Sequence, residues 1–151
     1  ATDTATTELG NEFTPPFSAR TCGAWAWLDG DGDFAIRLMS DNHATTHATT
    51  GTQTAAHRGT AASAGIYVLP WDASIASTYD LVKTTIYKMA LVPTTTTDII
   101  GYFFTIPAAG MMDNFAGGTT LYRANWVSGA YVDSTTERVM MGLMLCGFMD
   151  A

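Results

Sequence analysis

Runs of apolar and aromatic residues of strand length alternate with short polar breaks along most of the chain. The runs are rich in Ile, Val, Tyr, Phe and Thr, side chains that suit the pleated, half-buried surface of a β-sheet. They span residues 21–28, 33–39, 64–70, 99–106, 119–127, 129–132 and 137–148, with the prolines at their edges. With about seven to nine strands and few helix caps, this pattern predicts an all-β chain folded as a single antiparallel β-sandwich or jelly-roll-like domain.

The breaks between the runs predict how some strands connect. Residues 29–32 read Asp-Gly-Asp-Gly between the first two runs, and Asp-Gly in such a place predicts a β-hairpin. Apolar residues between 75 and 90 recur at near-helical spacing, yet residues 83–87 are β-branched and aromatic enough to favour a strand. We therefore expect a strand over about 81–92, after one helical turn near Ser74, and a turn at the Thr run 94–97.

Two segments are expected to lie outside the strands. Residues 1–16 begin with a polar, Thr-rich stretch that carries no basic or apolar region of a secretion signal, and they are expected to form an extended N-terminal segment. Residues 43–63 are nearly all Ala, Thr, Gly and His, so they bury too little apolar area to fold by themselves. A connection of this length is usually functional or ordered by a partner, and we expect a long, flexible Thr/Ala-rich loop or arm.

Composition and charge narrow the range of partners. The 151 residues suit one domain, 1–151, and only 14% of them are charged, with 25 Thr taking much of the place of charge. A net charge of −7 repels phosphate backbones and anionic lipids, which excludes nucleic acid and membrane surfaces as partners. No apolar run reaches the length of a membrane span.

Two cysteines lie near opposite ends of the strand-forming part of the chain, Cys22 and Cys146. They would close a long loop in an oxidising compartment, but two cysteines are too few for a scaffold built on disulfides. The favoured interpretation is two buried thiols on strands, because free Cys is among the most buried residue types.

A group of Asp residues and a pair of His residues each resemble part of a metal site, but neither has the full set of ligands. Asp29, Asp31 and Asp33 alternate as in an EF-hand, but Phe34 and Ser40 stand where the Gly and the Glu of that loop belong. A turn rich in Asp and Gly accounts for the same residues. His43 and His47 are four apart, but their Thr-rich surroundings offer no rigid second shell. No metal or other cofactor is predicted, and these residues are the positions where a metal site would form.

No enzyme signature emerges. The chain has no Gly-x-Ser-x-Gly elbow, its three His all lie in the expected arm, and no glycine-rich phosphate loop stands between a strand and a helix. We therefore expect a non-enzymatic protein with no catalytic residues.

The sparse charge predicts self-association instead. A monomer of this size normally covers itself with more charge, so a neutral surface of Thr, Ala, Gly, Met and aromatic residues favours a closed homo-oligomer. Methionines late in the chain are expected either in the core or in that interface. The interface candidates are His43, Thr46, His47, Thr50, His57, Arg58, Met140 and Met144.

Residues 25–37 resemble a segment found in another group of β-sandwich proteins. The segment 25–32, Trp-Ala-Trp-Leu-Asp-Gly-Asp-Gly, followed by Ala35-Ile36-Arg37, resembles the aromatic strand, glycine turn and Ile-Arg strand of β-sandwich domains in tailed-bacteriophage virion proteins. The amino-acid composition of the chain, which is low in Lys and rich in Thr, Ala and Gly, is similar to that of phage decoration and fibre proteins. The resemblance implies a homotrimeric structural protein on the virion surface, where it decorates (cements) the capsid beside the major capsid protein or forms a fibre head, without cofactor or catalytic residues.

A second hypothesis is a binding module. A fibre head, or a secreted or surface-displayed β-sandwich in an extracellular setting, would bind a receptor or glycan by stacking on exposed indoles. This hypothesis requires at least two of the four tryptophans, Trp25, Trp27, Trp71 and Trp126, to be accessible.

Overall fold

The computed structural model describes residues 2–3, 8–54, 64–95, 99–105, 122–127, 130–134 and 137–149. Every regular element in these residues is a β-strand, and the sheets are antiparallel throughout. Within this part of the chain no helix is long and apolar enough to cross a membrane. Two sheets pack face to face, so the predicted all-β sandwich is confirmed.

The fourteen described strands form two large sheets and one small one. Sheet A has the order β1 (Thr2–Asp3), β9 (Ile99–Gly101), β3 (Ala19–Asp29), β14 (Met141–Phe148), with β6 (Gly65–Pro70) and β7 (Tyr79–Leu81) also paired to β3. Sheet B has the order β12 (Ala130–Ser134), β11 (Tyr122–Val127), β2 (Leu9–Phe13), β8 (Tyr87–Pro93), β4 (Phe34–Ser40), β5 (Thr46–Thr49). The pair β10 (Phe103–Thr105) and β13 (Glu137–Val139) forms the small sheet C.

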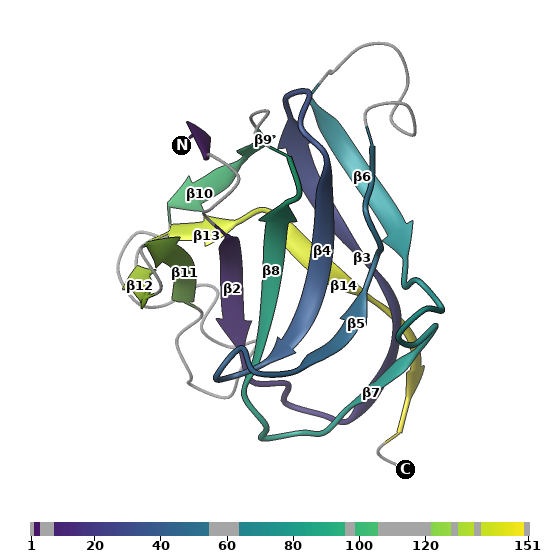
Figure 1. Ribbon diagram of the computed structural model, residues 1–151. Coiled ribbons are helices and arrows are strands. Elements are labelled where there is room, and N and C mark those ends of the chain that lie inside the picture. The colour runs from purple at the N-terminus through teal and green to yellow at the C-terminus, as the bar shows by residue number, and fades with distance from the viewer. Residues whose placement is uncertain are drawn as a thin grey trace.

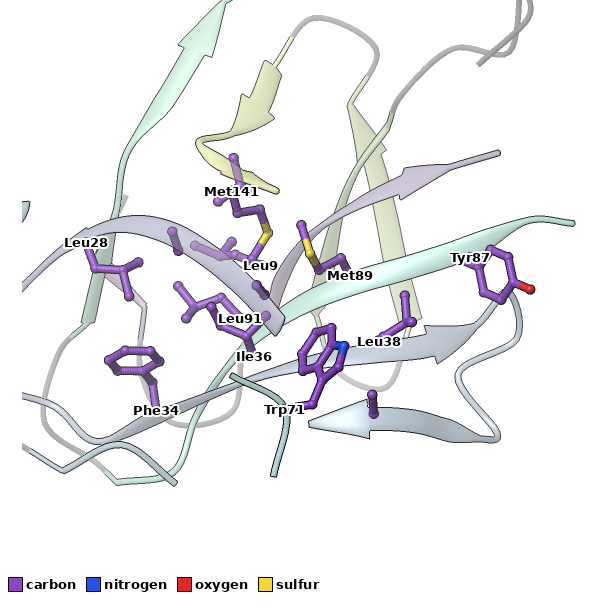
Figure 2. Close-up of a cluster of buried hydrophobic side chains, with 14 of the residues drawn as sticks. Leu9, Leu28, Phe34, Ile36, Leu38, Trp71, Tyr87, Met89, Leu91 and Met141 are labelled. Carbon is purple, nitrogen blue, oxygen red and sulfur yellow. The ribbon is translucent and has the colours of Figure 1, made fainter. Parts of the chain in front are cut away.

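The core lies between sheets A and B. In Figure 1, strands β2, β8 and β4 lie in front of β3 and β14. Alternate residues of each strand point into the space between the layers, because successive side chains of a strand face opposite ways. Figure 2 shows side chains from both sheets meeting there, among them Leu9, Leu28, Phe34, Ile36, Leu38, Trp71, Leu91 and Met141.

Strand β3 organises sheet A. Its inward positions are small or aliphatic, and Ala24, Ala26 and Leu28 are fully buried. One edge of β3 pairs with β6 and β7, and the other pairs with β14 and β9. The eleven residues of β3 therefore hold four other strands in place.

The Asp-Gly connection at 29–33 is not a hairpin, and that prediction is wrong. Strand β3 belongs to sheet A and β4 belongs to sheet B, so the connection carries the chain from one layer to the other. Both edges of β3 are already paired, which leaves β4 no place beside it. Gly30 has φ of 92°, a conformation that suits glycine and lets the chain change direction here.

The expected arm at 43–63 is also corrected for its first part. Residues 46–49 form β5, which pairs with β4, and residues Ala48 and Thr50 are buried. The hydroxyl of Thr50 accepts a hydrogen bond from the backbone N–H of Ile36 at 3.0 Å. Small side chains can complete a sheet when the neighbouring strand supplies the large apolar groups, so their composition does not require a loop. Residues 55–63 lie outside the described residues.

Several expected strands are confirmed with changed bounds. The run 64–70 corresponds to β6, the run 119–127 contains β11, and the run 129–132 overlaps β12, which extends to Ser134. The expected strand over 81–92 is two strands, β7 and β8, separated by a turn in which Thr84 has φ of 66°. The turn near Ser74 is a single hydrogen-bonded turn, in which the N–H of Ile75 donates to the carbonyl of Asp72.

Two long runs are each interrupted by one residue. Tyr102 separates β9 from β10, and Met140 separates β13 from β14. The N–H of Met140 donates to the carbonyl of Tyr102, and the carbonyl of Met140 accepts from the N–H of Trp27. At this junction both runs pass between sheet C and sheet A, so each of these two predicted strands is two strands in the structure.

The N-terminal segment contributes a central strand. Residues 9–13 form β2 between β11 and β8, and Leu9 is part of the core. Asn11 is buried on this strand, where its side-chain amide donates to the carbonyl of Val139 and accepts from the N–H of the same residue. One Asn side chain thus joins sheet B to sheet C.

Candidate functional site

An apolar surface covers the outer side of sheet A where β3 and β6 pair. Trp25 lies directly opposite Val68, and Trp27 lies opposite Ile66. Because paired residues share a face of the sheet, these four side chains form one surface, which we call the β3–β6 face. Ile66 is 61% exposed, Val68 58% and Trp27 37%, whereas Trp25 is half-buried.

Neighbouring elements position the two indoles of this face. Trp25 lies against Gly142 of β14, where an added Cβ would be only 2.5 Å from its Nε1. The ring of Trp27 contacts the ring of Tyr102 at a centroid distance of 5.6 Å. The hydroxyl of Tyr102 in turn donates to Oδ2 of Asp29 at 3.4 Å.

Of the four tryptophans, only Trp27 is clearly exposed among those whose side chains the structure describes. Trp71 is part of the core, and its indole N–H donates to the hydroxyl of Thr21 at 3.0 Å. The side chain of Trp126 lies outside the described residues. The requirement of two accessible indoles is therefore met by Trp27 and by the partly exposed Trp25 at most.

The three turn aspartates do not form a shared metal site. Oδ1 of Asp29 accepts from the N–H of Gly30 at 2.8 Å, so this carboxylate stabilises the turn. Asp31 is exposed, and the N–H of Asp33 donates to the hydroxyl of Thr95. Among the residues that the structure describes, no group of three or more His, Cys, Asp or Glu side chains is placed to hold a metal ion.

His43 and His47 occupy different surroundings. His43 follows β4 in a turn with φ of 58°, and burial, assisted by the nearby charge of Lys88, lowers its pKa to about 4. His47 lies on β5, where its ring stacks on Tyr79 at a centroid distance of 4.6 Å and meets the edge of Tyr87. Burial lowers the pKa of His47. Both rings are therefore neutral near pH 7 and packed against the fold.

The other interface candidates are divided by their burial. Thr46, Met140 and Met144 are half-buried, so each presents part of its side chain. Thr50 is only 4% exposed and bonded within the sheet, which removes it from any surface that a partner could contact. His57 and Arg58 lie outside the described residues.

Strand pairing also creates an ion cluster that the sequence gives no reason to expect. Glu12 of β2 and Lys88 of β8 are directly opposite, and their charged groups are 3.3 Å apart. Lys88 also lies 3.4 Å from the carboxylate of Asp41. The three residues are far apart in sequence, and the pairing of β8 with β2 on one side and with β4, which Asp41 follows, on the other brings them together.

Both cysteines lie on strands, as expected, and the two strands are neighbours, but the cysteines are not both buried. Cys22 is half-buried on β3, and Cys146 is exposed on β14. The prediction of two buried thiols is therefore wrong for Cys146. Leu145 and Phe148 on the same strand are exposed as well.

The sequence of β6 contains a signal for the β3–β6 face that the search for strand-length apolar runs does not detect. Residues 65–70 read Gly-Ile-Tyr-Val-Leu-Pro and contain no charged side chain. A strand with one solvated face normally alternates apolar and polar residues, and this strand does not.

No model of a known protein family matches the chain, and no curated protein matches it either.

Proposed function

We propose that this protein is a non-enzymatic structural subunit that assembles with copies of itself through the β3–β6 face. The observation that carries the proposal is the exposure of Ile66 and Val68 beside Trp27 on one side of a sheet. Soluble monomers seldom leave adjoining large apolar side chains exposed unless the patch binds something.

The uncharged composition of this face makes it the surface through which a second copy can bind. Each copy carries a net charge of −7, so two copies repel one another at most orientations. The β3–β6 face is formed by two Trp, one Ile and one Val, none of which carries charge. Contact through this face buries apolar area while keeping the charged groups of the two copies apart.

The resemblance to tailed-bacteriophage virion proteins supports a specific form of this proposal. In that form the oligomer is a closed homotrimer on the virion surface, where it decorates the capsid beside the major capsid protein. Antibody labelling of purified phage particles whose genome encodes the chain would test the setting, and unlabelled particles would refute it.

Light scattering after size-exclusion chromatography tests the self-association. We expect the unmodified chain to elute as a homo-oligomer and the double variant Ile66→Asp/Val68→Asp to elute as a folded 16.1 kDa monomer. The matched control is Ile75→Asp/Val82→Asp, which adds the same charge at residues that are 50% and 56% exposed but lie in loops. A monomeric parent chain, or equal dissociation by both pairs, would refute the proposal.

A second candidate function is saccharide binding at Trp27. An exposed indole beside Tyr102, with the carboxylate of Asp29 within reach of that hydroxyl, combines a stacking platform with a hydrogen-bond acceptor. Titration with simple hexoses should then quench the fluorescence of the parent chain but not of Trp27→Leu. No response in the parent chain would remove this candidate and leave the assembly proposal untouched.

A further inference from the structure

The pairing of the C-terminal strand β14 with β3 contains two adjacent irregularities. Leu145 pairs with Thr21, but the register shifts on both sides of this pair, toward Met144 and toward Gly147. The two residues left without a partner are Cys22 on β3 and Cys146 on β14. Each is the extra residue of its strand, and a bulge of this kind bends the backbone and redirects the side chain.

The two thiols both point into the seam between these strands. The thiol of Cys22 donates to the carbonyl of Met144 on β14 at 3.7 Å, and the thiol of Cys146 donates to the carbonyl of Arg20 on β3 at 3.5 Å. The neighbouring thiol of Cys146, together with burial, raises the pKa of Cys22. Cys22 and Cys146 lie on opposite sides of the Leu145–Thr21 pair, so they face each other diagonally across two neighbouring strands, and a disulfide requires that their Cα atoms come within about 7 Å.

The two cysteines differ in access. Cys146 is exposed and can be reached by a reagent in solution, whereas Cys22 is half-buried behind it. An accessible thiol next to a shielded one is the arrangement in which the first reacts with an oxidant and the second resolves the product.

We propose that Cys22 and Cys146 form a reversible intramolecular disulfide that locks the C-terminal strand to β3. The oxidant is a small-molecule disulfide. The thiolate of Cys146 attacks one of its sulfurs, forms a mixed disulfide and releases one thiolate. The thiolate of Cys22 then attacks the sulfur of Cys146 and releases the second thiolate. Two protein thiols are oxidised, one small disulfide is reduced to two thiols, and no other reactant is needed.

The disulfide would fasten a strand whose pairing with the rest of the sheet is irregular. Strand β14 is the last described strand, and its pairing with β3 is interrupted by the bulges. Its last residue, Phe148, is exposed, and its ring meets the ring of Phe17 edge-on at a centroid distance of 5.3 Å. A bond between Cys22 and Cys146 closes a loop of most of the chain, and long loops lose the most unfolded-state entropy when they are closed.

Oxidised glutathione is the probe for the test, applied to the native full chain and followed by intact mass and by non-reducing gels. We expect the parent chain to lose two hydrogens and remain free of attached glutathione. The variant Cys22→Ser should instead retain one glutathione on Cys146, because nothing resolves the mixed disulfide. The variant Cys146→Ser should react far more slowly. Oxidation should raise the thermal midpoint of the parent chain by about 5 °C or more, reversed by dithiothreitol.

Other outcomes overturn the proposal, and each does so independently of the proposed assembly. Disulfide-linked dimers would show that Cys146 pairs between copies. A parent chain that stores glutathione on both cysteines, or stays reduced in excess oxidant, would show that the thiols cannot meet. A disulfide that forms but leaves the thermal midpoint unchanged would show that β14 is not locked by it.

Discussion

Thr21 links three parts of the fold through one hydroxyl. This residue is fully buried, and its Oγ1 accepts from the indole N–H of Trp71 at 3.0 Å while donating to the carbonyl of Tyr79 at 3.1 Å. The substitution Thr21→Val keeps the shape but leaves both polar groups unpaired. We expect a loss of about 1–3 kcal/mol of unfolding free energy, measured by urea denaturation. Thr78→Val, at an exposed site, should cost little, and equal losses would contradict this role.

Gly142 is required by the indole that lies on it. A Cβ at this position would be 2.5 Å from Nε1 of Trp25, which is closer than real Cβ contacts. Gly142→Ala should displace the ring, cost about 1–3 kcal/mol and increase quenching of Trp fluorescence by acrylamide. The same change at Gly147 on the same strand meets its nearest atom at 3.8 Å and should be nearly neutral. Equal effects at the two positions would show that strand propensity, not the ring, sets the cost.

At the scale of elements, strand existence could be predicted from the sequence better than strand pairing. The run 64–70 corresponds to β6, because its apolar composition is decisive by itself. The hairpin prediction failed because a short Asp-Gly connection is compatible both with pairing and with a change of sheet. Only the occupied edges of β3, which depend on residues more than thirty-five positions away, decide between these two.

The candidate site divides in the same way. The sequence shows which Asp and His residues could bind a metal, but only the fold determines whether their side chains come together. In the structure His43 and His47 lie in separate surroundings. Residues Ile66 and Val68 resemble ordinary core residues in the sequence. Their exposure follows from the side of sheet A on which they lie, opposite the side that carries the buried Ala24 and Ala26. Strand β5 cannot be recognised from its own residues, which are mostly Thr and Ala, because pairing with β4 stabilises the strand.

Strand β5 therefore gives a prediction opposite to that for a flexible arm. Deleting residues 46–49 should lower the thermal midpoint substantially, since it uncovers the edge of β4 and removes the buried Ala48. It also displaces Thr50, whose hydroxyl accepts from Ile36. Scanning calorimetry checks this, and an unchanged midpoint would restore the interpretation of a dispensable arm.

Asn11 is the polar contact that holds sheet C against sheet B. Its amide makes hydrogen bonds of 2.9 and 3.0 Å with the carbonyl and N–H of Val139, in place of a backbone partner. Asn11→Ala should leave both buried backbone groups unsatisfied and cost about 2–4 kcal/mol. Hydrogen exchange should then become faster at Val139 before it does at Leu91 in the core. Uniform acceleration across both sites would show that the two sheets unfold as one unit and that Asn11 does not join them locally.

At the scale of the whole molecule, the buried histidines make stability depend on pH. In the unfolded chain a histidine titrates near pKa 6.5, whereas in the fold the pKa of His43 is lowered to about 4 and that of His47 is also lowered. Between these values the unfolded state binds more protons, so acidification favours unfolding. The stabilisation is fully present above about pH 6.5 and is lost as the pH falls toward 4.

Substitution of one histidine at a time separates this effect from the titration of carboxylates. The thermal midpoint of the parent chain should fall between about pH 7 and pH 5, a range above the ordinary pKa values of Asp and Glu. His43→Gln removes the group whose pKa is lowered most, so its midpoint should fall less over the same range, whatever its value at pH 7. His47→Gln should flatten the profile as well, although it also removes the ring stacked on Tyr79 and should therefore begin from a lower midpoint. If both variants kept the slope of the parent chain, the two rings would have to be as accessible to protons in the fold as in the unfolded chain, and their burial against Lys88 and Tyr79 would be refuted.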